Sequence, residues 1–162
     1  MFDHCYYLDV RASDQSESHF PIEIGVAGSL SSFSFVIKPT QSWIANWSSE
    51  AQLNSGSSPQ DLNTNGLSAT EAAQALNDNL AGLIIFCDDQ ADIDMVSQLY
   101  AAAESQPAFR MELMIEDWVD DMISDYARLV AEHKAQHTTL DAKPALKGAA
   151  AMRYAHANMI PL

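Results

Sequence analysis

The chain has 162 residues, 48% of them hydrophobic, and a formal net charge of −14. This length suits one domain over residues 1–162, and the charge argues against a broad basic face of the kind that holds nucleic-acid phosphates. No stretch approaches the roughly 20 apolar residues that span a bilayer, and the start lacks a basic signal-like segment, so we expect a cytoplasmic protein with no membrane association.

The first third of the sequence predicts three strands. Two apolar runs, 4–11 and 21–28, are separated by a polar loop and predict an antiparallel pair. The run 33–37 alternates apolar and polar residues and adds a third strand to the meander. Residues 39–67 are rich in Ser, Asn, Gln, Gly and Pro, and we expect a long ordered loop with one helical turn, anchored by Trp43 and Trp47.

The rest of the sequence predicts helices alternating with strands. Ser68 and Glu71 fit a capping box at the start of a helix, and Gly82 is expected to end that helix. Further on we expect a buried strand over 83–87, a helix over 91–104, a short strand over 109–114, a helix over 117–136 and an alanine-rich helix over 140–157.

This order of elements predicts an α/β domain with a mixed five-stranded sheet flanked by helices. A right-handed crossover from the meander would set strand 83–87 parallel to the first strand. Carboxylates at strand ends and helix starts would then meet at one edge of the sheet.

Four acidic positions stand where they could converge. They are Asp9 on the first strand, Asp88 or Asp89 after the fourth, Asp92 at the start of the next helix, and Asp141 near the start of the last. Three carboxylates from separate elements are what a two-metal phosphoryl-transfer site requires, with Mg²⁺ or Mn²⁺ as the ions. Bound metals would also invert the local charge and let an acidic protein hold nucleic acid.

The sequence resembles the DEDD (DnaQ-like) 3'–5' exonucleases of the ribonuclease H-like fold. The similarity lies in Tyr7-Leu8-Asp9-Val10-Arg11, in the "IEIG" run 22–25, and in His137-Thr-Thr-Leu-Asp141. The resemblance implies a ribonuclease H-like domain that hydrolyses the phosphodiester bonds of single-stranded DNA or RNA ends.

The resemblance also implies roles for individual residues. Asp9, Asp92 and Asp141 would hold the metal ions, with Asp94 or Asp88 as alternatives to Asp92, and His137 would be the general base. Ser55 and Gly56 occupy the loop that seats the terminal nucleotide in the family.

Three departures from the family pattern predict a degenerate site. Arg11 stands where the family has the Glu of Asp-x-Glu, and a guanidinium cannot bind a cation. The His137 to Asp141 spacing is one residue shorter than the family's His-x4-Asp, and the nucleotide-seating loop differs from His-Gly-Ile. We expect Arg11 to pair with Asp9 or with an acid such as Glu23 and to take the place of one metal.

Simpler interpretations stay open for the same residues. Asp92 and Asp141 could simply cap helices, and His137 could be an ordinary surface histidine. The two tryptophans could simply anchor the loop. The chain is thus either a metal-dependent 3'–5' exonuclease or an inactive relative that binds nucleic acid, a nucleotide or a protein. A protein-binding module with an acidic surface, or a homodimer, is the third alternative.

Overall fold

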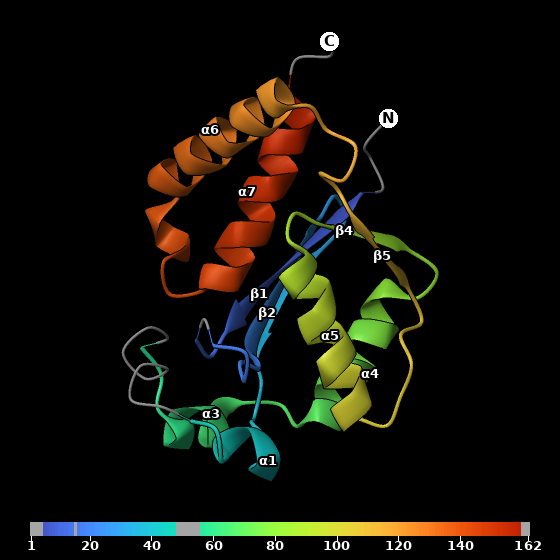
Figure 1. Ribbon diagram of the computed structural model, residues 1–162, viewed down its shortest axis with the longest axis vertical. Coiled ribbons are helices and arrows are strands. Elements are labelled where there is room, and N and C mark those ends of the chain that lie inside the picture. The colour runs from blue at the N-terminus through green and yellow to red at the C-terminus, as the bar shows by residue number, and fades with distance from the viewer. Residues whose placement is uncertain (1–4, 15, 48–55, 160–162) are drawn as a thin grey trace.

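The computed structural model describes residues 5–14, 16–47 and 56–159, which form a sheet with helices on both faces (Figure 1). The strand order is β3-β2-β1-β4-β5. The first three strands are antiparallel, while β4 and β5 run parallel to β1, as the sequence predicts. The strands are β1 (Tyr6–Ala12), β2 (Pro21–Gly28), β3 (Ser32–Val36), β4 (Ile84–Cys87) and β5 (Arg110–Leu113).

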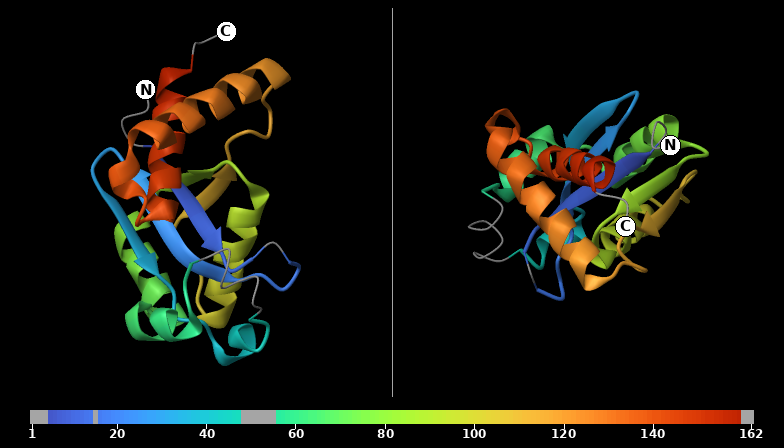
Figure 2. Two further views of the ribbon diagram at one scale, coloured as in Figure 1. Left: turned by 90° about the vertical axis from the view of Figure 1, so that its left-hand side faces the viewer. Right: turned by 90° about the horizontal axis from the view of Figure 1, so that it is seen from above.

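Helices cover the two faces of the sheet in separate groups (Figure 2). One group is α4 (Ala69–Leu80) and α5 (Gln90–Ala102), and the other is α6 (Asp120–Gln136) and α7 (Pro144–Asn158). Shorter pieces are α1 (Gln41–Ile44), α3 (Pro59–Asn65) and the 3₁₀ turn η1 (Thr138–Leu140). The capping box at Ser68 is present, since its hydroxyl accepts from the Glu71 backbone and Glu71 accepts from the Ser68 backbone.

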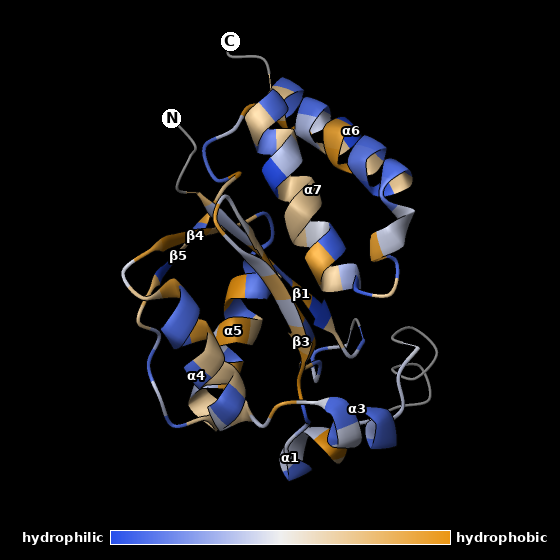
Figure 3. Ribbon diagram, turned by 180° about the vertical axis from the view of Figure 1, so that it is seen from behind, coloured by the Kyte–Doolittle hydropathy of each residue, from blue (hydrophilic) through white to orange (hydrophobic). Residues whose placement is uncertain are grey.

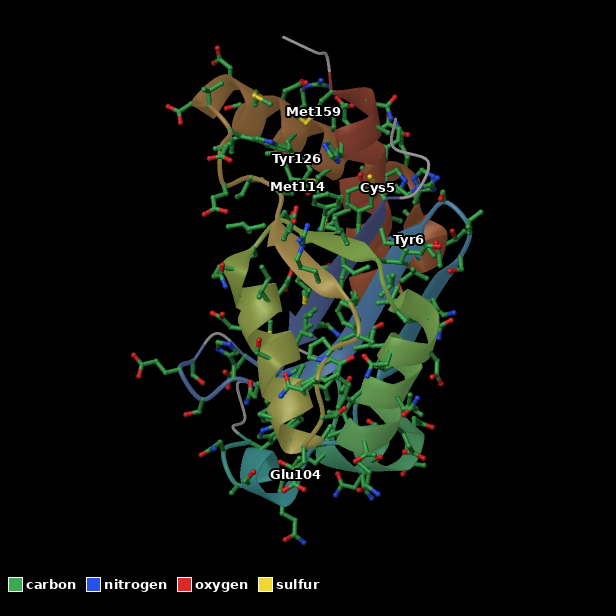
Figure 4. All side chains as sticks on the ribbon, turned by 90° about the vertical axis from the view of Figure 1, so that its right-hand side faces the viewer. Cys5, Tyr6, Glu104, Met114, Tyr126 and Met159 are labelled. Atoms are coloured by element: carbon green, nitrogen blue, oxygen red, sulfur yellow. The ribbon has the colours of Figure 1, made fainter. Side chains whose placement is uncertain are left out.

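Side chains of β1 alternate between the two faces. Leu8 and Val10 belong to the main core with α4 and α5, whereas Tyr7 belongs to a second cluster with Met152 of α7. The odd-numbered residues therefore face α7, and Asp9 is among them. Figure 4 shows the second cluster at the α6–α7 end, where Met114, Tyr126 and Met159 lie near one another.

The last helix differs from its predicted course. The expected helix over 140–157 is replaced by η1 and then by α7, which begins at Pro144. Proline suits a first helical position because its missing N–H has no partner there in any case. The backbone N–H of Ala145 donates to the carboxylate of Glu23, so a β2 side chain satisfies one of the free donors at the start of α7.

Two glycines let α7 lie directly on the sheet. A Cβ at Gly25 of β2 would stand 2.1 Å from the backbone nitrogen of Leu146, and a Cβ at Gly148 of α7 would stand 1.6 Å from Oδ2 of Asp9. At both points the backbone of α7 therefore lies closer to the sheet than it could if either glycine carried a side chain.

Polar residues dominate the outer surface of α6, while apolar residues concentrate on the strands (Figure 3). Within the described part of the chain, no helix is both long and apolar enough to cross a bilayer.

Candidate functional site

An acidic cavity of about 410 Å³ lies at the carboxyl end of β1. Its charged lining comes from β1, the β1–β2 loop, the segment that joins β4 to α5, and the first turn of α5. The lining residues are Asp9, Val10, Arg11, Ala12, Asp14, His19, Asp88, Asp89, Ala91, Asp92 and Met95. Three of the four predicted acidic positions therefore converge here, with both Asp88 and Asp89 at the second of them, whereas Asp141 is not part of the described lining.

Asp9 and Asp92 are the two carboxyl groups whose acidity this cavity changes most. Asp92 is 4% exposed, and burial, together with the nearby charge of Asp9, raises its pKa to about 9. Burial and the charge of Asp88 raise the pKa of Asp9 to about 7. At neutral pH the pair therefore retains protons, because two adjacent anions with little water around them repel each other.

Two further acids of the lining, Asp88 and Asp89, have structural partners. Asp88 accepts a hydrogen bond of 2.8 Å from the hydroxyl of Tyr126, and Asp89 is the N-cap of α5, accepting 2.9 Å from the backbone of Ala91. The N-cap is thus Asp89 and not Asp92. Oδ2 of Asp92 is buried and has no hydrogen-bond partner among the described residues.

Arg11 forms an ion pair with Glu23, directly opposite it on β2. Its Nε donates to Oε2 of Glu23 over 2.9 Å, and the Glu23 side chain is 4% exposed. Burial raises the pKa of Glu23, and the guanidinium opposes that rise. Of the two expected partners, Glu23 is the one to which Arg11 is bound.

Replacing Arg11 with methionine is expected to reduce the free energy of unfolding by about 2 kcal/mol, because Glu23 would remain buried without its cation. The double variant Arg11→Met, Glu23→Gln should recover most of the loss, since no buried charge is left. Arg110→Met is the matched control: its pair with Glu112 is exposed and is worth less than about 1 kcal/mol. Urea denaturation measures all three, and equal losses in Arg11→Met and Arg110→Met would contradict the argument.

The residue of α7 that faces Asp9 is Gly148. The family pattern ends in His-x4-Asp on the last helix, and the same spacing that ends at Gly148 begins at Lys143. The segment Lys143-Pro-Ala-Leu-Lys-Gly148 thus has the His-x4-Asp spacing, with a cation and a glycine at its two ends.

The other residues of the predicted site lie elsewhere or outside the described chain. Asp141 is exposed and paired with Lys147, and His137 ends α6, with its ring 3.8 Å from that of His133. Neither belongs to the described lining of the acidic cavity. Gly56 is exposed in the loop before α3, at φ +65°, and Ser55 lies outside the described residues.

Two lining residues, Asp14 and His19, were missed in the sequence. Both lie in the β1–β2 loop, and Nδ1 of His19 is 2.6 Å from the backbone oxygen of Ser16. They belong to no sequence motif. They reach the cavity only because of the way the loop folds in the tertiary structure. Gly148 was not singled out in the sequence, although its spacing from Lys143 was a usable signal.

The residues present do not fit a two-metal centre. Within residues 5–14, 16–47 and 56–159, no three His, Cys, Asp or Glu side chains are grouped so that they could hold a metal ion. The α7 position facing Asp9 carries no carboxylate, and the cation of Arg11 lines the same cavity. Two divalent ions need several oxygen ligands around each, and this arrangement does not supply them.

Comparison with solved structures identifies the same fold in exonuclease I. A product-bound exonuclease I aligns over 96% of this chain and 43% of its own, with TM-score 0.62 and 11% identity. E. coli exonuclease I in complex with a 5cy-dA13 oligonucleotide aligns over 93% of this chain and 39% of its own, with TM-score 0.62 and 14% identity. Exonuclease I from Methylocaldum szegediense covers 79% and 30%, with TM-score 0.52 and 17% identity.

The chain spans less than half the length of these solved structures. No protein-family model matches its sequence, and no curated protein matches it. At 11–17% identity the similarity establishes the fold: the predicted α/β, ribonuclease H-like architecture with a mixed five-stranded sheet is confirmed.

Proposed function

We propose that this chain, which shares its fold with exonuclease I, is a catalytically inactive relative that binds a partner at the acidic end of its sheet. The observation that carries the proposal is the contact of the α7 backbone at Gly148 with Asp9. A carboxylate from the last helix would have to stand where this contact lies.

Hydrolysis by two metals would need more than Asp9 and Asp92. It would need a third ligand opposite Asp9, room for the ions, and a base close to the attacked phosphate. Gly148 supplies no ligand, its backbone lies against Oδ2 of Asp9, and His137 is stacked on His133 and is not part of the described lining of the acidic cavity. Arg11 adds a positive charge beside the position that an ion would take.

The charges of the cavity favour a cationic partner over a nucleic acid. Five of its lining residues are aspartates, and the whole chain carries a formal charge of −14. Asp9 and Asp92 retain protons at neutral pH, but without metal ions the other three lining aspartates and the charge of the whole chain repel phosphates and attract a lysine- or arginine-rich protein segment.

A second function, metal-dependent 3'–5' hydrolysis at single-stranded DNA or RNA ends with Mg²⁺ or Mn²⁺, has one observation in its favour. Asp9, Asp88 and Asp92 line one cavity, and Oδ2 of Asp92 is buried without a hydrogen-bond partner in the described chain. An unpaired carboxylate oxygen of this kind is what a cation would bind.

Digestion of 3'-labelled single-stranded DNA and RNA in Mn²⁺ separates the two functions. We expect no release of label by the native protein, by Asp9→Ala or by Arg11→Glu, because Gly148 leaves each of them without the last-helix ligand. Activity in the native protein that disappears in Asp9→Ala would establish the enzyme. Activity in Arg11→Glu alone would show that Arg11 by itself blocks the reaction, which would overturn the role given to Gly148.

Binding to a lysine-rich peptide tests the partner class, with a glycine- and serine-rich peptide of equal length as the uncharged control. We expect the charged peptide to bind and Asp89→Asn to weaken it, because Asp89 is exposed at the cavity. Asp94→Asn is the matched control: Asp94 is exposed on the same helix but is not part of the described lining. Tighter binding of metal-free single-stranded DNA than of the peptide would contradict the proposal.

A further inference from the structure

A second cavity, of about 400 Å³, lies between α7 and the meander. One stripe of α7 lines it with residues three or four apart, which is the spacing of a single helix face. The lining residues are Tyr7, Ala27, Ser32, His133, Ala150, Arg153, Tyr154, Ala157 and Asn158. None of them lines the acidic cavity, so the two spaces are separate.

The charge in this second cavity is opposite to that of the acidic one. Arg153 contributes an exposed guanidinium, and no carboxylate belongs to the described lining. Over residues 5–14, 16–47 and 56–159, Arg153 takes part in no ion pair. Because its guanidinium has no carboxylate partner among the described residues, Arg153 is available to bind an anionic group.

His133 supplies a second polar group whose hydrogen bonding is incomplete. It is 8% exposed, and its Nδ1 is buried without a hydrogen-bond partner among the described residues. His133 therefore contributes its ring to the wall of the cavity, while its Nδ1 lies away from the open space.

Aromatic rings stand beside these two groups. The ring of His133 lies 5.0 Å from that of Tyr154, and the hydroxyl of Tyr7 is 2.7 Å from Nδ1 of His156. Ala27, Ala150 and Ala157 leave the space open, because their side chains are small. The cavity thus combines flat rings, small residues and one cation.

We propose that this cavity binds a small aromatic anion, with the guanidinium of Arg153 on its phosphate or carboxylate group and its ring beside Tyr154 and His133. The volume is within the 300–1,000 Å³ range of small-molecule sites and suits a ligand no larger than a mononucleotide. The planar guanidinium matches either anionic group with two parallel hydrogen bonds. This site is independent of the function proposed for the acidic cavity.

Calorimetric titration of the whole chain tests the site with four probes: adenosine monophosphate, inorganic phosphate, benzoate and adenosine. We expect adenosine monophosphate or benzoate to bind, and the tighter of the two assigns the anionic group. Inorganic phosphate should bind more weakly because it has no ring, and adenosine should bind at least about tenfold more weakly than its monophosphate because it has no charge.

Arg153→Gln should weaken the binding of the best anion at least about tenfold. Arg110→Gln, which changes an exposed arginine at the other edge of the sheet, should leave it unchanged. His133→Gln gives a second test at the buried wall and should weaken binding without abolishing it. Absence of binding by every probe, equal binding of adenosine and its monophosphate, or equal losses in Arg153→Gln and Arg110→Gln would each overturn the proposal.

Discussion

Replacing Gly25 with alanine should reduce the free energy of unfolding by at least about 4 kcal/mol. The new Cβ would stand 2.1 Å from the nitrogen of Leu146 and 2.2 Å from the carbonyl carbon of Ala145. Both atoms belong to the backbone of α7, so no side-chain rotation relieves the clash. The helix must move off the sheet, and the hydrogen bond from Ala145 to Glu23 is lost with it.

Gly82→Ala is the control for the change of residue type itself. Gly82 has φ +76° and no atom within 4 Å of an added Cβ, so its replacement strains the backbone by about 1 kcal/mol without a steric clash. Urea denaturation followed by circular dichroism measures both variants. If Gly25→Ala loses no more than Gly82→Ala, the close packing of α7 on β2 is not what holds the helix there.

Asp92→Asn should stabilise the protein by about 3 kcal/mol at pH 8 and by much less at pH 5. The ordinary pKa of an aspartate is 3.8, and in the folded protein the pKa of Asp92 is about 9 and that of Asp9 about 7. Between these values the folded state holds protons that the unfolded state has released. The native protein therefore loses stability as the pH rises from about 4 toward 9, and an uncharged residue at position 92 removes much of that loss.

Thermal unfolding at pH 5 and pH 8 checks this prediction. The native protein should melt at a lower temperature at pH 8, and the difference between the two pH values should shrink in Asp92→Asn. Asp94→Asn is the control, since Asp94 is exposed on the same helix and hydrogen-bonded to Gln90. A native protein that is more stable at pH 8, or a pH dependence unchanged by Asp92→Asn, would show that these two carboxyl groups do not share a desolvated space.

The contacts at Gly25 and Gly148 also bear on the absence of activity that we propose. They bring α7 so close to β1 and β2 that the carboxyl group of Asp9 meets a helix backbone instead of a second carboxylate. The digestion assay therefore tests the contact between α7 and Asp9, and the pH profile tests the buried space that Asp9 shares with Asp92.

The sequence alone determined most of the architecture. Two apolar runs and a third, alternating run placed the meander. The capping box at Ser68 placed the start of α4, and the order of elements predicted the parallel pairing of β4 with β1. These features depend on local periodicity and on chain connectivity, which a single sequence displays directly. The convergence of Asp9, Asp88 and Asp92 followed from the same topology.

The partners of those side chains were decided only by the tertiary structure. Asp141 and His137 had suitable residue types, with a spacing one residue short, yet α7 begins later than expected and presents Gly148 to Asp9. Arg11 had two acids within reach in the sequence, and strand register set it opposite Glu23. A shift of a few residues along a helix changes which side chain faces the sheet, and that shift depends on close packing between distant segments, which residue types alone do not encode.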